Sequence, residues 1–227
     1  MGYEFDFGSV MEYWPELAKG AWKTVLLSGF SIIFGFVAGT ALAVARVHGN
    51  RTMSALATGY VELIRNTPLV VQAFWLFFGL AALGLHVPAF EAAIITLVIN
   101  VSAYTAEIIR AGMESIPKGQ FEAADCLALS RTQVLFHVEL PQAVERVYPA
   151  LISQFVLMML ASSIMSQISV EELTGAAYGI QSITFRGFEI YIVVAVIYLA
   201  LSVLMRLAME GAAQMAFTRR RRLGTPL

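Results

Sequence analysis

Three stretches of this 227-residue chain, residues 24–45, 66–90 and 147–170, contain no Asp, Glu, Lys or Arg and are dominated by apolar side chains. Each exceeds the roughly 20 residues that a helix needs to cross the apolar core of a bilayer. Backbone polar groups in lipid must be paired within the segment itself, so stretches of this kind are expected to be helices. The chain is therefore expected to be an all-α integral membrane protein.

Two further apolar stretches carry charges only near their ends. Residues 90–109 have Glu91 and Glu107 at their limits, and residues 190–212 have Arg206 and Glu210 in their last turns. A mean hydropathy of +0.71 with 14% charged residues excludes an ordinary soluble domain. The sequence thus predicts five transmembrane helices. Residues 173–185 are too short and too rich in Gly, Ser and Thr to cross, and are expected to be interfacial or re-entrant.

The distribution of basic residues predicts the orientation, because cytoplasmic loops are enriched in Lys and Arg. Five crossings place the termini on opposite sides, with the N-terminus outside and the C-terminus in the cytoplasm. This assignment puts most basic residues on the cytoplasmic side: Arg46, Arg51, Arg110, Lys118, Arg131, Arg146, Arg206 and the arginines of residues 219–222. The chain is then divided into an extracytoplasmic segment (1–23), a transmembrane domain (24–212) and a basic cytoplasmic tail (213–227).

A polar loop, about residues 114–146, separates the third and fourth crossings and reads GQFEAADCLALSRTQVLFHVELP over residues 119–141. It is expected to form two short helices with a turn near residues 128–130. Ser130 is a suitable N-cap for the second helix, which Pro141 would end or kink. The loop either packs against its own bundle or docks on a partner in the water.

The spacing of this loop is specific: EAA, three residues, a small residue, nine residues, an aliphatic residue, one residue, then LP. It resembles the EAA loop of binding-protein-dependent ABC importer permeases, which transmits the motion of a cytoplasmic ATPase. The resemblance assigns ATPase coupling to Gly119, Glu122, Ala123, Ala124, Ala128, Leu140 and Pro141. The family usually has glycine at position 128, and alanine lacks its freedom to adopt positive φ. The loop is therefore expected to turn at a neighbouring residue or to run more helically.

The third crossing carries polar side chains at membrane depth, where an unpaired charge is costly. These are Asn100, Ser102, Tyr104 and Glu107, with Arg110 one turn further on. Glu107 and Arg110 are expected to form an ion pair near the cytoplasmic surface. For Asn100, Ser102 and Tyr104 two interpretations stay open, local structural pairing and the wall of a translocation path.

The second element begins after Arg51 and contains the string RNTPLVVQ, in which Pro68 predicts a break or kink near residues 66–68. Glu62 and Arg65 lie three residues apart and are expected to neutralise each other. This string resembles the RxTPxxxQ segment of the polar amino acid subfamily of these permeases. Residues 100–124 likewise resemble the subfamily pattern SAYxAExxRxGxxSIxxGQxEAA.

The fourth crossing departs from that subfamily, which commonly reads KDTSLxxxIxxxELT. Leu160 and Ala161 stand where lysine and aspartate are usual, whereas Ser162 and Ser163 are retained. The two serines are candidates for the substrate path, although their hydroxyls could bond their own helix carbonyls. Without the carboxylate a cationic substrate is less favoured, unless a second, non-identical permease subunit supplies it.

Two other features have simple structural explanations. Gly35 and Gly39 form a GxxxG pattern, for which packing inside one subunit is favoured over a dimer interface. The loop after the fourth crossing carries Glu171, Glu172, Arg186 and Glu189, which are expected to be solvated charges. The resemblance implies that a solute-binding protein docks on this side.

The resemblance covers most of the chain and implies a type I ABC importer permease fold, of the histidine, glutamine and glutamate permease type, in a bacterial inner membrane. It implies as partners an ATPase dimer, a second permease subunit (paralogue or second copy), a periplasmic solute-binding protein, an amino acid substrate and membrane lipid. The chain lacks the phosphate loop GxxxxGK[ST], so ATP and Mg are expected on the ATPase and no cofactor on this chain. A net charge of −1 gives no indication of nucleic-acid binding.

Two alternatives come from other classes of protein. A membrane-embedded enzyme is disfavoured because His48, His86 and His137 are scattered, and no catalytic or metal-binding arrangement is evident. A self-sufficient secondary carrier is disfavoured by five crossings without an internal repeat.

Overall fold

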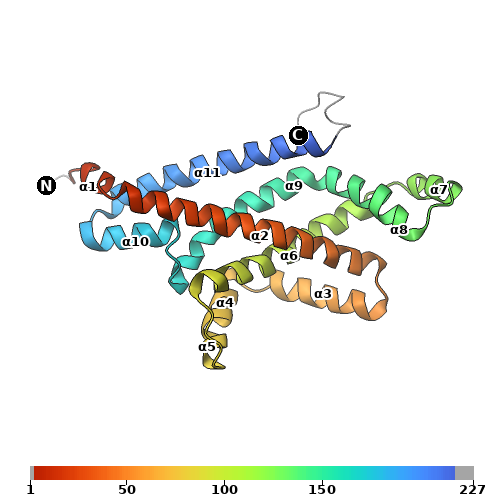
Figure 1. Cartoon of the computed structure of the whole chain (residues 1–227), viewed down its shortest axis with the longest axis horizontal. Coiled ribbons are helices and arrows are strands. Elements are labelled where there is room, and N and C mark those ends of the chain that lie inside the picture. The colour runs from red at the N-terminus through yellow and green to blue at the C-terminus, as the bar shows by residue number, and fades with distance from the viewer. Residues whose placement is uncertain (1–2, 218–227) are drawn as a thin grey trace.

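The computed structural model describes residues 3–217, which are mostly helical (Figure 1). The elements in chain order are α1 (Gly8–Met11), α2 (Trp14–His48), α3 (Arg51–Arg65), α4 (Leu69–Phe74), a π-helical turn (Trp75–Gly79), α5 (Leu80–Ala82), α6 (Ala89–Glu114), α7 (Lys118–Cys126), α8 (Arg131–Val134), a second π-helical turn (Leu135–Glu139), α9 (Leu140–Ala161), a 3-10 helix (Ser162–Ile168), α10 (Leu173–Thr184) and α11 (Gly187–Ala216). The basic tail at residues 219–222 lies outside the described residues.

Four of these helical stretches are long and apolar enough to cross a membrane: α2, α6, the continuous stretch Arg131–Ile168, and α11. A fifth crossing requires the pair formed by α3 and the α4–α5 arm, which is bent by 105°. The sequence predicted an element that begins after Arg51 and breaks near Pro68, with its charge-free stretch at residues 66–90, and this bent pair has that layout. The α4–α5 arm is much shorter than the roughly 20 residues of a crossing, so α3 must contribute to it.

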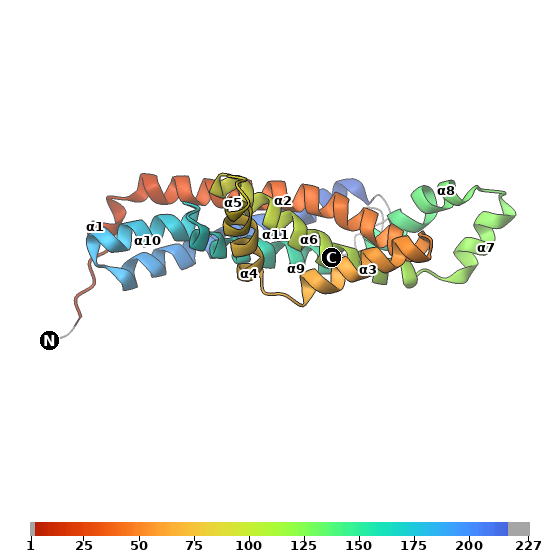
Figure 2. The same ribbon diagram turned by 90° about the horizontal axis from the view of Figure 1, so that it is seen from below.

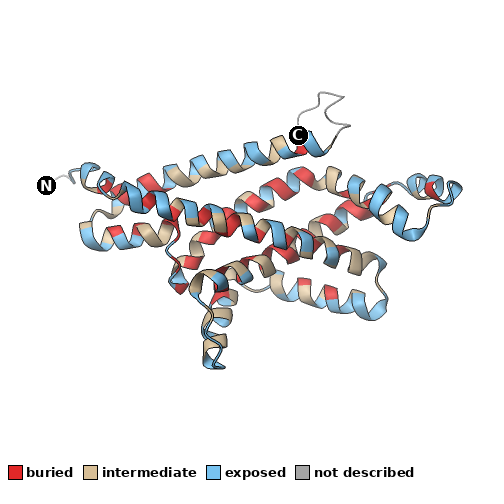
Figure 3. Cartoon of the chain, in the orientation of Figure 1, coloured by how far each residue is buried: buried red, intermediate tan, exposed pale blue. Residues whose placement is uncertain are grey.

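The core lies where α2, α6 and α9 cross in the middle of the molecule (Figure 3). Its fully buried side chains include Leu27, Leu97, Val101 and Leu151. The α2–α6 contact is close because α2 presents glycines there: a Cβ on Gly39 would lie 2.6 Å from the Ser102 carbonyl oxygen. A Cβ on Gly35 would lie 2.5 Å from the Val101 side chain. The predicted role of GxxxG in packing within the subunit is confirmed.

The break between α3 and α4 falls at residues 66–68, as Pro68 predicted. Proline cannot donate to the preceding turn, so the carbonyl groups at the end of α3 need other donors. The Thr67 hydroxyl donates to the Leu63 carbonyl at 2.9 Å, and the Gln72 side-chain amide donates across the break to the Ile64 carbonyl at 2.8 Å and the Thr67 carbonyl at 3.1 Å. The bend is thus held by a side chain of the second arm.

The two ends of the bundle carry different elements. Helices α7 and α8 project at one end, whereas α1 and α10 lie at the other (Figures 1 and 2). Helix α10 is short and packs against α2 and α11, in agreement with the prediction that residues 173–185 do not cross. Most of α11 is exposed (Figure 3), which suits a helix that faces lipid or another subunit.

Two of the four charges predicted to be solvated at the α10 end are instead buried. Glu172 is fully buried and accepts hydrogen bonds from the Tyr198 hydroxyl at 2.7 Å and the Gly175 amide at 2.9 Å, which caps α10. Burial raises the pKa of the Glu172 carboxyl. Glu189 is also fully buried, where it accepts from the Asp6 amide and pairs with Arg186 at 3.5 Å. Both carboxylates therefore fix the fold at this end.

Candidate functional site

The polar loop forms two short helices, α7 and α8, as predicted, at the end of the bundle away from α1 and α10 (Figure 1). Glu122 and Ala123 are exposed on α7, whereas Ala124 is buried. Gly119 has open space where a side chain would begin. Leu127 and Phe136 are 73% and 60% exposed, so this loop presents apolar as well as acidic surface to the water.

The turn between the two helices occurs at Ala128 itself, which adopts the left-handed conformation with φ of 54°. The expectation that alanine would move the turn to a neighbouring residue is wrong. The Leu129 amide donates to the Ala124 carbonyl at 3.2 Å and the Ala128 amide to the Asp125 carbonyl at 2.9 Å. These two bonds form a Schellman motif, which requires a left-handed residue at this position and imposes that conformation on alanine.

Replacing Ala128 with glycine is therefore expected to stabilise the loop. A left-handed L-residue costs roughly 1–2 kcal/mol, and glycine removes that cost. We expect slower hydrogen exchange at the Ala128 and Leu129 amides in Ala128→Gly than in the wild type. Ala123→Gly, in the middle of α7, is the matched control and should accelerate exchange; acceleration in both variants would contradict the account.

Helix α8 begins with a capping box in which Ser130 and Gln133 exchange hydrogen bonds, so the predicted N-cap is confirmed. The prediction that Pro141 ends or kinks this helix is wrong, because the chain is helical without interruption from Arg131 to Ile168. The chain stays helical, and the missing proline donor is accommodated by the π-helical turn Leu135–Glu139 just before it. Leu140 is half-buried and Pro141 is exposed. The loop is thereby joined to α9 without an interruption.

Long-range contacts attach the loop to the bundle. The Arg146 guanidinium donates to the Ser115 carbonyl at 2.6 Å, tying α9 to the end of α6. His48 Nε2 at the end of α2 lies 2.7 Å from the Glu139 carboxylate, whose side chain is 4% exposed. No local pattern in the sequence indicated the His48–Glu139 pair, because the partners are far apart in the chain. A displacement of the loop would thus reach α2, α6 and α9.

Glu107 lies at the centre of a charged cluster that joins three helices. It pairs with Arg110 on its own helix, as predicted, and also with Arg46 of α2 at 2.6 Å and Arg65 of α3 at 3.4 Å. Arg65 reaches Glu107 rather than Glu62, so the predicted Glu62–Arg65 pair is wrong. Glu62 instead accepts from the Asn66 side chain at 3.0 Å. The arginine partners on other helices carried no local signal.

An open groove of about 510 Å³ lies between the α3–α4 break, α6 and α9. Two of the predicted path residues, Asn100 and Tyr104, line it, together with Arg65, Pro68 and Ala161. Asn100 donates to the Gln72 side chain at 3.1 Å, which links α6 to the amide that holds the bend. The structure therefore brings the break and the polar stripe of α6 to one surface.

The other predicted path residues lie elsewhere. The Ser102 hydroxyl is buried against the Tyr60 hydroxyl at 2.8 Å and does not line the groove. Ser162 and Ser163 bond the Met159 and Leu160 carbonyls at 2.6 and 2.7 Å. The hydroxyl of each of these two serines thus bonds a carbonyl of its own helical stretch, as the structural interpretation expected.

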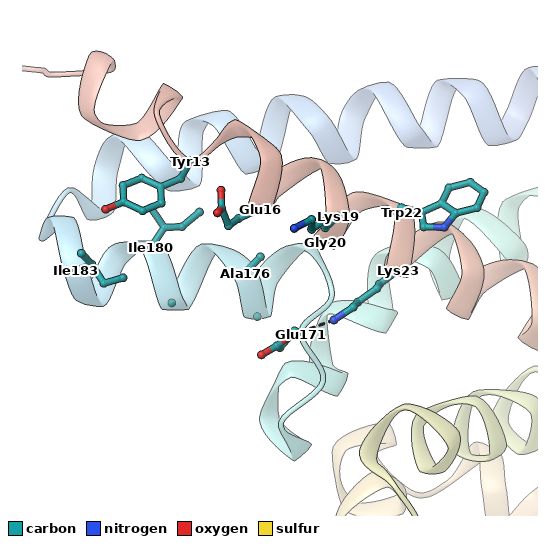
Figure 4. A pocket seen from close by; sticks show the side chains of 12 residues that line it. Tyr13, Glu16, Lys19, Gly20, Trp22, Lys23, Glu171, Ala176, Ile180 and Ile183 are labelled. Carbon is teal, nitrogen blue, oxygen red and sulfur yellow. Dashed lines mark hydrogen bonds and ion pairs between the residues drawn. The ribbon is translucent and has the colours of Figure 1, made fainter.

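A second groove of about 600 Å³ lies at the opposite end, between α2 and α10 (Figure 4). Its charged lining residues include Glu16, Lys19, Lys23 and Glu171, and the Lys23 ammonium pairs with Glu171 at 3.0 Å. Both partners are well exposed, so the pair contributes little stability. This groove faces the side on which a binding protein is expected from the sequence.

Comparison with known proteins places the chain among transporter subunits. It is 39% identical over 184 residues to a probable glutamine ABC transporter permease protein, GlnM, of Bacillus subtilis, covering 81% of this chain and 85% of that one. It is 36% identical to the nopaline transport system permease protein NocM of Agrobacterium fabrum, covering 90% and 89%.

The fold has a solved counterpart. The structure of an amino acid ABC transporter with histidines superposes with a TM-score of 0.85 at 35% identity, covering 94% of this chain and 100% of that one. Residues 31–214 match the family described as binding-protein-dependent transport system inner membrane component. This chain therefore belongs to that family and has the type I ABC importer permease fold, with a function in transport rather than in catalysis.

Proposed function

We propose that this protein is the membrane-spanning permease subunit of an ABC importer for a polar amino acid. The support is the identity of 36–39% to permeases named for glutamine and nopaline, over four fifths or more of the chain. The groove beside the α3–α4 break is the proposed part of the translocation path, with Asn100 and Tyr104 in its wall. Two such subunits, as copies or paralogues, would enclose the path between them.

The observation that carries the proposal is the helix pair α7–α8, which projects from one end of the bundle with Glu122 and Leu127 exposed. We assign to it the contact with a pair of ATPase subunits, which bind ATP and Mg. Closure of those subunits would displace the loop, and the contacts of Arg146 and Glu139 would carry the displacement to α6 and α2. Substrate then moves because the two states expose the path to opposite sides with different affinity.

The orientation follows from the same assignment. The α7–α8 end lies in the cytoplasm of a bacterial cell, and the α1–α10 end, with the groove of Figure 4, faces a solute-binding protein. Cys126, the single cysteine of the chain, is exposed on α7 and provides a native probe of this arrangement. When the chain is expressed without an ATPase partner, a membrane-impermeant maleimide should label Cys126 in inside-out vesicles and not in intact cells. Labelling in intact cells would show that the α7–α8 end lies outside the cell, opposite to the proposed orientation.

The coupling assignment is tested by co-expressing the chain with its genomic neighbours and comparing wild type with Glu122→Lys. The wild type should co-purify with an ATPase, support ATP-dependent amino acid uptake in liposomes and show Cys126 protected from maleimide. In Glu122→Lys the rate of ATP-dependent uptake should fall at least tenfold, because a cation replaces an exposed anion at the contact with the ATPase.

Glu12→Lys reverses another exposed carboxylate, at the opposite end of the bundle; it is the matched control and should retain ATPase binding. If Glu122→Lys behaves as the wild type and no ATPase is recovered, the loop is only a packing element and the coupling role is wrong. Uptake by the purified chain alone would favour a self-sufficient carrier instead.

A further inference from the structure

A third groove, of about 710 Å³, lies at the start of α11, at the end of the bundle that carries α1 and α10 (Figure 1). It is formed by the N-terminal segment (residues 3–7), the α10–α11 turn and α11. Its lining residues include Tyr3, Phe185, Phe188, Tyr191, Ile192 and Ala195. Phe185 and Phe188 are 86% and 70% exposed. Aromatic side chains gathered in this way on the surface mark a site of contact with something other than water.

The position of the groove along α11 indicates the surface of a bilayer. Only 11% of the most apolar part of α11 is buried, compared with 61% of that of α6. Aromatic rings are enriched at the level of the lipid headgroups, where a spanning helix begins or ends. From the aromatic turn the groove continues onto the first turns of α11, through Tyr191, Ile192 and Ala195. It therefore runs from the headgroup level toward the hydrocarbon.

The N-terminal segment is held against the α10–α11 turn by a buried carboxylate. Glu189 accepts hydrogen bonds from the Tyr3 hydroxyl at 2.5 Å and from the Asp6 amide at 3.0 Å. The Arg186 guanidinium donates to the Glu4 carbonyl oxygen at 2.9 Å. These bonds place Tyr3 in the wall of the groove, so the groove is formed before any ligand enters it.

Two charged side chains of opposite sign lie beside the groove. Arg186 stands between Phe185 and Gly187, which both line it, and the Arg186 side chain is 35% exposed. Its contacts with the Glu4 carbonyl oxygen and with Glu189 both use Nη1. A guanidinium has five N–H donors, so donors remain for a phosphate. The Glu4 side chain is exposed on the neighbouring segment and can accept from an amine.

We propose that this groove binds a zwitterionic phospholipid with a primary amine, with an acyl chain along α11 and the phosphate and amine at Arg186 and Glu4. The groove is continuous with the exposed apolar face of α11, which favours a lipid as its occupant. One cation and one carboxylate match such a headgroup, whereas Glu4 and Asp6 would repel an anionic one. The inference goes beyond the transport function and requires only that α11 spans a membrane.

The test measures the thermal midpoint of the purified subunit in detergent while phospholipid is titrated into the micelles. Three lipids with identical acyl chains are compared: phosphatidylethanolamine, phosphatidylcholine, whose headgroup has no N–H donor, and the anionic phosphatidylglycerol. A ligand at ten times its dissociation constant should raise the midpoint by about 3–6 °C. We expect this shift with phosphatidylethanolamine and at most half of it with the other two lipids.

Phe188→Ala and Glu4→Gln test the two parts of the site separately. Phe188→Ala removes apolar wall and should abolish the shift with all three lipids. Glu4→Gln should reduce the phosphatidylethanolamine shift to that of phosphatidylcholine. Tyr178→Ala, at another exposed aromatic residue that does not line the groove, is the matched control and should keep the wild-type shifts.

A purely structural role for Phe188 would lower the midpoint without lipid and leave the lipid-induced shift as in the wild type, and this result overturns the proposal. Equal shifts with the three lipids in the wild type, or wild-type shifts in Glu4→Gln, also overturn it. If a second copy of this chain occupies the groove instead, the midpoint should rise with protein concentration and not with lipid, and the lipid assignment is then wrong.

Discussion

Gly39→Val should strongly lower the thermal midpoint of the purified subunit, because it inserts a side chain where two helices touch. A Cβ at this position would lie 2.6 Å from the Ser102 carbonyl oxygen and 2.6 Å from the Thr105 Cβ. The first neighbour is backbone, so the clash cannot be relieved by rotating a side chain. Helices α2 and α6 would have to separate along the largest helix contact in the described part of the chain.

The expected cost is about 3 kcal/mol, the upper range for overpacking a close contact. At roughly 2–4 °C per kcal/mol for a chain of this size, the midpoint should fall by about 6–12 °C. Gly29→Val is the matched control, because Gly29 lies on the same helix and its added Cβ would meet nothing within 4 Å. If the thermal midpoint falls equally in both variants, then the presence of valine in α2, and not the clash at the α2–α6 contact, is responsible.

Glu107→Gln is the second substitution expected to have a large effect. One carboxylate faces Arg46, Arg65 and Arg110, from three helices, and the Arg46 side chain is only 9% exposed. The neutral amide would leave these cations close together without an anion between them. Removing one partner of a buried ion pair costs more than the pair contributed, because the remaining charge stays desolvated.

The expected destabilisation is about 2–3 kcal/mol, below the full buried value since Glu107 is 24% exposed. Thermal denaturation in detergent, with ATPase co-purification as a check on assembly, measures it. Glu114→Gln is the control: that carboxylate pairs with Arg110, is 56% exposed, and should cost less than about 1 kcal/mol. If the two variants lose similar amounts of stability, then the cluster around Glu107 contributes no more than an exposed ion pair does.

Sequence reasoning succeeded where a signal depends on neighbours within one or two helical turns. Long apolar stretches predicted the helices, Pro68 predicted the break, and Ser130 predicted the cap of α8. The spacing of the polar loop predicted the family that the comparisons confirmed. Each of these features is determined by a missing donor, a short side chain near its own backbone, or a run of apolar residues.

The same reasoning failed where local preference competes with a contact from elsewhere. Ala128 should avoid positive φ, yet the two hydrogen bonds that close α7 require it there. Glu62 and Arg65 are ideally spaced for pairing, yet each has another partner. A stronger interaction with a fixed geometry overrides a weak local one, and the sequence does not show which partners will be present.

The sequence by itself determined that this chain is a helical membrane protein, where its second crossing breaks, and which loop it presents to the water. Only the tertiary structure decided that Gln72 holds the break, that Glu107 joins α2, α3 and α6, and that Glu172 and Glu189 are buried. Helix formation and breaking depend on residues a few positions apart. Pairing of buried polar groups depends on which helices cross, and that is set by contacts such as those of Gly35 and Gly39, where the backbones of two helices distant in the sequence approach closely.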